Sequence, residues 1–192
     1  LNGFKKMNFK KNKNVLIFGA GPIGYLIASL AIYFKSKKII IIDNNIRRLN
    51  IGLKNKKLFK LNLNNYKKKL DKIISKNEII DYGFVACNST KAQSEILKIV
   101  GKNATVNFFS GIKNKNKSIN TYLDTNLIHY KQLNVVGSHG SNQKDLISSA
   151  KLIVGKKIKI KKIITNSYKL TDFVRAFNKF KSGKSLKVVI NP

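Results

Sequence analysis

The chain of 192 residues has few of the residue types that cross-link small proteins or bind metals. Cys87 is its only cysteine, so neither a disulfide within the chain nor a structural zinc cluster can form. The two histidines, His129 and His139, cannot complete a conventional zinc site with one cysteine 42 positions upstream. No signal peptide and no run long enough to span a membrane is present. We therefore expect a cytoplasmic protein with no membrane partner.

Acidic residues and arginines are also scarce, and lysine supplies nearly all of the positive charge. Eight acidic residues stand against 39 lysines and arginines, for a formal net charge of +31, and only Arg47, Arg48 and Arg175 are arginines. The excess of lysine, asparagine and isoleucine indicates A/T-rich codon usage. Because the lysines are scattered over every segment, we expect no specific nucleic-acid partner, only salt-sensitive adsorption to polyanions.

The most informative segment is VLIFGAGPIG at 15–24, an apolar run followed by glycines spaced G-x-G-x-x-G. Between a strand and a helix, this spacing predicts a dinucleotide-binding unit. We expect Gly19 to permit a tight turn, Gly21 to let the backbone approach a pyrophosphate, and Gly24 to let the helix pack on the strand. Pro22 suits the first turn of that helix, where its missing N–H costs nothing.

Asp43 ends the next apolar run, 19 positions after Gly24. At about this distance a carboxylate binds the adenosine ribose and repels a 2′-phosphate, which favours NAD over NADP. Arg47 and Arg48 lie close by and are able to accept a 2′-phosphate, so NADP stays open as the alternative. A purely structural interpretation is also open, in which Asp43 only caps the following helix.

Strand-like and helix-like runs alternate to about residue 155. This alternation predicts an α/β fold with a doubly wound, six-stranded parallel sheet in the order 3-2-1-4-5-6. Ligands would bind at the carboxyl ends of strands 1 and 4. The expected strands are 14–19, 38–43, 57–61, 79–87, 104–109 and 133–137, and the expected helices are 22–35, 45–54, 64–77, 90–100 and 142–155.

Two loops are expected at the same ligand edge of the sheet. The polar segment 111–120 follows the fifth strand, either as a solvated loop or as a flap beside the cofactor. A short helical piece at 125–132 leads into the sixth strand, which runs into Gly-Ser-His-Gly at 137–140. The glycines there indicate a backbone that approaches a ligand closely.

A tail that the six-stranded sheet does not need follows residue 155, so it requires another partner. We divide the chain into a dinucleotide-binding domain, 1–155, and a tail, 156–192. Three phenylalanines recur at helical spacing in the tail, which indicates a packing stripe rather than a ligand site. The tail is expected to fold as a strand, an amphipathic helix and a strand, at 157–165, 170–183 and 185–192.

These segments together resemble the medium-chain, zinc-type alcohol dehydrogenases, especially the polyol (sorbitol) and threonine dehydrogenase branch. The resemblance covers essentially the whole chain. The glycine motif is shared by many dinucleotide-binding proteins, whereas the segment at 123–141 and the tail are far more specific to this group. The matching segments are LNG at 1–3, VLIFGAGPIG at 15–24, D-x-x-x-x-R-L at 43–49, LDTNLIHYKQLNVVGSHGS at 123–141, FVRAFNKFKSG at 173–183 and KVVINP at 187–192.

The resemblance implies a Rossmann-type cofactor domain that normally follows a zinc-bearing catalytic domain, and that the tail packs on that domain. Such enzymes transfer hydride between a secondary alcohol and NAD, with zinc polarising the alcohol oxygen. Zinc is expected only in the absent domain, so we assign no catalytic and no metal-binding residue and expect NAD binding without turnover. Leu1 in place of Met indicates an unusual start codon or a start within a longer reading frame.

The resemblance also carries cofactor contacts onto residues outside the glycine turn. Two departures from the family pattern bear on them: Ala-Cys-Asn-Ser at 86–89 replaces an acidic residue and glycine, and Asn166 stands where a histidine is common. The carried contacts are Ile23 on the cofactor, Asp43 and Arg48 on the adenosine ribose, Ser110, Gly111 and Ile112 beside the nicotinamide, and Ser138 and His139 in a second cofactor loop.

Other functions remain open. The chain could be a non-catalytic module that senses nucleotide or docks a partner through its tail, such as a separate catalytic domain or a second copy in a homo-oligomer. A different Rossmann enzyme, such as a methyltransferase, is disfavoured by Asp43 together with the dehydrogenase-like tail.

Overall fold

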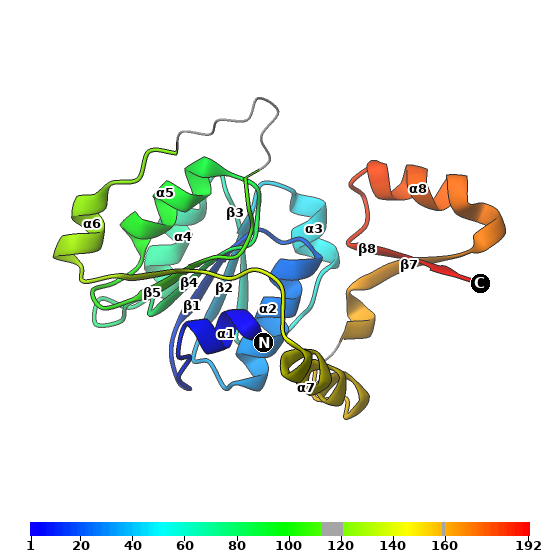
Figure 1. The fold of residues 1–192 in the computed structure, drawn as a ribbon. Helices are drawn as coiled ribbons and strands as arrows, with labels where there is room; N and C mark the ends of the chain where they lie inside the picture. Colours follow the sequence, from blue (N-terminus) through cyan, green and yellow to red (C-terminus); the bar gives the residue numbers. More distant parts are fainter. Residues whose placement is uncertain (113–120, 159) are drawn as a thin grey trace.

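The structure is a computed structural model that describes residues 1–112, 121–158 and 160–192. Figure 1 shows a larger part, with a central sheet covered by helices on both faces, and a small tail to its side. In the part of the chain that is described, no helix is long and apolar enough to cross a membrane.

Six parallel strands form the central sheet in the order β3-β2-β1-β4-β5-β6. This order confirms the predicted doubly wound fold, and it reverses between β1 and β4, where two neighbouring strands lead to helices on opposite faces. The strands are β1 (Val15–Phe18), β2 (Ile39–Asp43), β3 (Leu58–Asn62), β4 (Tyr82–Val85), β5 (Thr105–Phe108) and β6 (Asn134–Gly137).

The two faces of the sheet bury two separate cores because successive side chains of a strand point to opposite sides. Val15 and Ile17 of β1 face one core, and Leu16 and Phe18 face the other. Helices α1, α2 and α3 contribute to the first core, and α4 and α5 to the second. The helices of this part are α1 (Asn2–Lys6), α2 (Pro22–Tyr33), α3 (Ile46–Ile51), α4 (Tyr66–Ile73), α5 (Thr90–Ile99), α6 (Thr125–Tyr130) and α7 (Gln143–Val154).

Helix α1 was not predicted from the sequence, because its five residues carry no helical period to detect. Tertiary contacts hold it in place. Phe4 is buried in the first core, and the carbonyl of Gly3 accepts a hydrogen bond of 3.2 Å from Nδ2 of the buried Asn107 in β5. Helix α1 therefore packs across the end of the sheet near β6.

The tail differs from its prediction at its beginning. The expected strand over 157–165 is wrong: a 3-10 turn occupies Ile160–Lys162, and strand β7 begins only at Ile164. The reason is tertiary, because Ile158 and Ile163 are buried in the first core of the larger part, which an extended strand in the tail would not allow. From there the β-α-β pattern holds, with β7 (Ile164–Lys169), η2 (Leu170–Asp172), α8 (Phe173–Lys181) and β8 (Lys187–Asn191), and β7 and β8 pair in parallel as a separate sheet.

Packing beside the first core leaves no room at Gly52, which ends α3. A Cβ there would lie 1.8 Å from Cζ of Tyr25, whose side chain is fully buried and whose hydroxyl donates to the carbonyl of Arg48 at 2.9 Å. We expect Gly52→Ala to lower the free energy of unfolding by about 1–3 kcal/mol because the tyrosine must shift. Urea unfolding of both proteins measures this.

Gly137→Ala is the matched control, because a Cβ at Gly137 would meet nothing within 4 Å. We expect the control to change stability by less than about 0.5 kcal/mol. Equal losses in the two variants would show that crowding at Tyr25 is not the cause.

Candidate functional site

The glycine turn between β1 and α2 has the backbone that the motif predicts. Gly19 has a φ of +109°, a conformation that side chains disfavour. A Cβ at Gly24 would lie 1.8 Å from the carbonyl oxygen of Gly19, so the helix packs against the turn with no space for a side chain. A Cβ at Gly21 would meet nothing within 4 Å, which leaves open space in front of the first turn of α2. Pro22 is the first residue of that helix, as predicted.

Asp43 fixes this turn to the end of the neighbouring strand. Its Oδ2 accepts a hydrogen bond of 2.6 Å from the backbone N–H of Ala20, and its Oδ1 accepts one of 2.7 Å from that of Asn45. The cap of α3 is Asn45, whose side chain accepts from the N–H of Arg48 at 3.1 Å. The interpretation in which Asp43 only caps the following helix is therefore wrong, because Asn45 is the cap and Asp43 holds the glycine turn. The remaining lone pairs of Asp43 leave it able to accept further hydrogen bonds.

A cavity of about 420 Å³ opens beside this carboxylate, between α4 and α5 at the carboxyl ends of the strands. Its lining combines apolar side chains with a polar rim, which suits a planar base and a sugar. The lining residues are Phe18, Gly19, Ile42, Asp43, Asn44, Leu63, Tyr66, Lys67, Cys87, Asn88, Ser89, Lys91, Ala92 and Glu95.

Cys87 lines the cavity just after β4 and is half-buried. Burial first, and the charge of Asp43 second, raise the pKa of its thiol to about 11. The thiol is therefore protonated at neutral pH. Because the thiolate is the nucleophilic form, the protonated Cys87 lines the cavity without acting as a nucleophile.

The far wall of the cavity is a hydrogen-bonded pair on α4 and α5. The hydroxyl of the buried Tyr66 donates to Oε1 of Glu95, and Lys67 lies 3.1 Å from the same oxygen. The bond from Tyr66, more than the nearby lysines, lowers the pKa of the Glu95 carboxyl. Burial first, and Glu95 second, raise the pKa of Tyr66. This wall keeps a negative charge next to the cavity at neutral pH.

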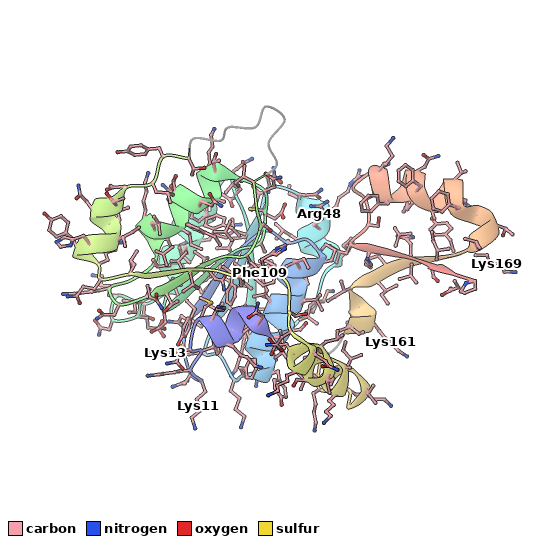
Figure 2. The ribbon with its side chains drawn as sticks, in the orientation of Figure 1. Lys11, Lys13, Arg48, Phe109, Lys161 and Lys169 are labelled. Carbon is pink, nitrogen blue, oxygen red and sulfur yellow. The ribbon has the colours of Figure 1, made fainter. Side chains whose placement is uncertain are left out.

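The structure brings Gly19 and Asp43 together in the cavity lining but leaves the other predicted contacts around it. Ile23 is 42% exposed in the first turn of α2, next to the open space at Gly21. Arg48 lies on α3 on the side toward the tail (Figure 2), and its Nε is buried without a hydrogen-bond partner among the described residues.

The two loops predicted beside the nicotinamide lie at the carboxyl ends of β5 and β6, outside the cavity lining. The N–H of Ser110 donates to the carbonyl of Val85 at 3.0 Å, and Gly111 is exposed, whereas Ile112 is half-buried. The remainder of the predicted flap, 113–120, lies outside the described residues. His139 is exposed.

One polar cluster at this edge was missed from the sequence. Asn107 of β5 is fully buried. Its Oδ1 accepts a hydrogen bond from the Ser138 hydroxyl at 2.9 Å, and its Nδ2 donates to the carbonyl of Gly3. Asn2 of α1 donates to the carbonyl of Gly140, at 3.1 Å, after β6. The sequence gives one indication of this cluster, which is an asparagine within the mostly apolar run Ala-Thr-Val-Asn-Phe-Phe at 104–109. The cluster fixes the loop that carries Ser138 and His139.

Across residues 1–112, 121–158 and 160–192, no three metal-ligating side chains come together. No protein-family model matches the chain.

Comparison with known proteins confirms the resemblance inferred from the motifs. L-threonine 3-dehydrogenase of Aliivibrio fischeri is 26% identical over 182 residues, covering 93% of this chain and 51% of that enzyme. D-xylulose reductase A of Aspergillus oryzae is 24% identical over 191 residues, covering 97% of this chain and 52% of that enzyme. The chain thus spans about half the length of the curated relatives it matches.

Solved structures share the fold over nearly the whole chain. A candidate zinc-binding dehydrogenase from Clostridium scindens superposes with a TM-score of 0.86 at 20% identity, covering 99% of this chain and 53% of its own. A short chain alcohol dehydrogenase from Escherichia coli CFT073, in complex with NADH, gives 0.80 at 20% identity, covering 97% and 54%. A candidate zinc-binding dehydrogenase from Sinorhizobium meliloti 1021, bound to NADP, gives 0.81 at 16% identity, covering 100% and 56%.

The two hydrogen bonds on Asp43 generate a stability prediction for the site. Asp43→Asn replaces one carboxylate oxygen with an amide N–H₂, so one of the two backbone donors loses its acceptor. We expect the free energy of unfolding to fall by about 1–3 kcal/mol in chemical denaturation.

Asp71→Asn is the control, since Asp71 is exposed on α4 and makes no ion pair or side-chain hydrogen bond within the described structure. We expect it to leave stability unchanged within about 0.5 kcal/mol. An Asp43→Asn variant as stable as the control would show that the carboxylate does not hold the turn.

Proposed function

We propose that these residues form the NAD-binding part of a zinc-type alcohol or polyol dehydrogenase. The observation that carries the proposal is the glycine turn at Gly19 and Gly24, fixed by Asp43 at the mouth of the cavity. Bound NAD would supply the hydride acceptor for oxidation of a secondary alcohol. The relatives and neighbours that act on threonine or xylulose, or hold a nicotinamide dinucleotide, support this class of reaction.

The residues present fit the dinucleotide. Open space in front of Gly21, at the N-terminus of the 12-residue helix α2, suits the pyrophosphate, because free backbone N–H groups and the helix dipole both favour an anion there. The cavity suits the adenosine, and Asp43 and Arg48 would hold its ribose. Ile23 would contact the cofactor beside the turn.

The loops after β5 and β6 would position the nicotinamide half. Ser110, Gly111 and Ile112 follow β5, and Ser138 and His139 follow β6. Asn107 supports this assignment because its side chain fixes the hydroxyl of Ser138. We assign His139 a binding role and no role as a catalytic base.

NAD is preferred over NADP in this proposal. The support is the carboxylate of Asp43, which would repel a 2′-phosphate on the ribose that it binds. Arg47 lines a shallow pocket with Asn44 and Lys184 next to this position, and it is the residue that would favour NADP instead.

Zinc and the alcohol substrate would be held by residues outside these 192, as a catalytic domain beside the tail. A polypeptide of these residues would therefore bind NAD and not turn over an alcohol. No histidine is among the residues that line the cavity: its one thiol is protonated, and His139 is exposed outside it.

A titration with NAD and NADP tests the proposal on the 192-residue chain. We expect NAD at a hundredfold excess over its Kd to stabilise the fold by about 2.7 kcal/mol in thermal or chemical unfolding. Gly21→Val should abolish this stabilisation, because the new side chain would occupy the space of the pyrophosphate while meeting nothing within 4 Å at its Cβ in the free chain.

The controls separate binding from folding and from turnover. Asp71→Asn, on the exposed face of α4 and outside the cavity lining, should retain the full response to NAD, and an alcohol-oxidation assay should show no NADH formation. Absence of stabilisation by either dinucleotide would refute the proposal, and a stronger response to NADP would refute the assignment of Asp43.

The tail supports a second candidate function, the docking of a partner. Its helix α8 exposes Phe173, Phe177 and Phe180 by 52%, 48% and 62%, and Phe173 stacks on Phe177 with ring centroids 6.0 Å apart. Apolar side chains gathered in this way on one exposed helix indicate a contact surface. We propose that a catalytic domain, or a second copy of the chain, covers this stripe.

Substitution of the stripe tests this candidate. Phe173→Ser with Phe177→Ser should reduce self-association of the chain in sedimentation velocity without changing the NAD response, because the stripe lies outside the cavity. Leu146→Ser is the control, an equally exposed apolar residue on α7 that is not in the stripe. Self-association that is unchanged by the double substitution would refute a second copy of the chain as the partner at this stripe.

A further inference from the structure

The fold brings one third of the lysines, twelve of 36, to one edge of the central sheet. The loops that precede the strands, at the amino-end edge of the sheet, carry twelve lysines and two acidic residues. The described loop residues that follow the strands, at the carboxyl-end edge, carry no lysine or arginine before the next helix begins. Lys67 and Lys91 in the first turns of α4 and α5 line the cavity at that edge, and Lys113, Lys115 and Lys117 after β5 lie outside the described residues. The twelve are Lys10, Lys11, Lys13, Lys35, Lys37, Lys38, Lys54, Lys56, Lys57, Lys76, Lys102 and Lys131, and we call them the lysine edge.

Five members of the lysine edge are engaged with the protein itself. Lys13 pairs with Asp81 at 2.8 Å, and Lys37 and Lys38 pair with Glu78 at 2.6 and 2.5 Å. Lys57 donates to the carbonyl of Ser36 at 3.0 Å, and Lys131 donates to three carbonyls at the end of α5. These lysines account for both acidic residues of the edge.

The other seven lysines are exposed and make no ion pair or side-chain hydrogen bond among the described residues. They are distributed over the first five of the six loops rather than on one segment, and Figure 2 shows Lys11 pointing away from the protein at this edge. Helix ends favour a lysine each through the helix dipole. The loops before β1, β2 and β3 nevertheless carry three lysines each, which is more than the dipole of one preceding helix accounts for. The seven are Lys10, Lys11, Lys35, Lys54, Lys56, Lys76 and Lys102.

Backbone hydrogen bonds join these loops into one continuous strip. The N–H of Asn12 donates to the carbonyl of Lys35 at 2.9 Å, and that of Lys37 donates to Lys13 at 2.9 Å. The N–H of Asn103 donates to the carbonyl of Lys131 at 2.7 Å. Six strands at a spacing of about 4.8 Å make the strip roughly 24 Å long. Its charges are thus held in a row of fixed length.

We propose that the lysine edge binds the phosphodiester backbone of a nucleic acid without selecting bases. A linear row of ammonium groups matches a linear polyanion, and lysines that neutralise phosphates gain affinity through counterion release. The strip offers no arginine, which is the residue that most often reads bases. This site is independent of the proposed dinucleotide site, which lies at the opposite edge of the sheet.

The test uses the 192-residue chain and a labelled oligouridylate of about 12 nucleotides, within the range of single-strand site sizes. Fluorescence anisotropy at several salt concentrations gives the affinity and its salt slope. Converting Lys11, Lys35, Lys54 and Lys56 together to Gln should weaken binding at least about tenfold at 0.1 M salt and reduce the magnitude of the slope by about 3.

The matched control converts Lys68, Lys69, Lys144 and Lys151 to Gln. These four are exposed, unpaired in the described structure and located on α4 and α7, so the net charge changes equally. We expect the control to keep the slope within about 1 of the original. An equal loss in both variants would overturn the proposal in favour of adsorption by net charge alone.

Three further readouts decide the nature of the ligand. Saturating NAD should leave oligonucleotide affinity unchanged, and displacement by NAD would place the polyanion in the cofactor site instead. Oligoadenylate should bind as tightly as oligouridylate, and strong preference for one would contradict backbone recognition. Phosphatidylserine vesicles bound as tightly as the oligonucleotide, with the same loss on substitution of the edge, would assign the edge to a membrane surface and overturn the proposal.

Discussion

The close approach of helix α2 to the end of β1 is the constraint on which the site depends. The space between the Gly24 backbone and the carbonyl of Gly19 is too small for a single carbon atom, and the turn that permits this has a positive φ at Gly19. Asp43 then fixes the same turn from the neighbouring strand through the N–H of Ala20. In the proposed function, the pyrophosphate would occupy the open space at Gly21 and meet the N-terminus of α2, so that its recognition would use main-chain N–H groups and need no lysine.

The described loops at the edge proposed for the cofactor carry no lysine, and the lysines that line its cavity, Lys67 and Lys91, belong to α4 and α5. The helix N-termini already supply partial positive charge at the carboxyl-end edge. The twelve lysines of the lysine edge lie at the opposite end of the strands, where the helices end and the partial charges are negative. The parallel topology thus places the two proposed anion sites, one of backbone dipoles and one of side-chain charges, at opposite edges of the sheet.

The tail is packed differently from the rest of the chain. Its first residues, Ile158 and Ile163, are buried in the core of the larger part, whereas its helix α8 turns three phenylalanines outward. It is therefore anchored at one end and open at the other. An anchored element with an exposed apolar face is suited to join the dinucleotide-binding part to something else, in keeping with a chain that spans about half the length of its relatives.

The sequence by itself determined the strand order, the glycine turn, Asp43 and the phenylalanine spacing, because each depends on local periodicity or on fixed spacing along one βαβ unit. Five residues of α1, the buried Asn107 that holds Gly3 and Ser138, and the late start of β7 at Ile164 were decided only by tertiary structure. Their conformations are set by contacts between residues far apart in the chain, which leave no period to detect. The lysine edge is the clearest case: parallel pairing brings residues from six separate loops to one end of the sheet, and no count along the sequence can reveal that.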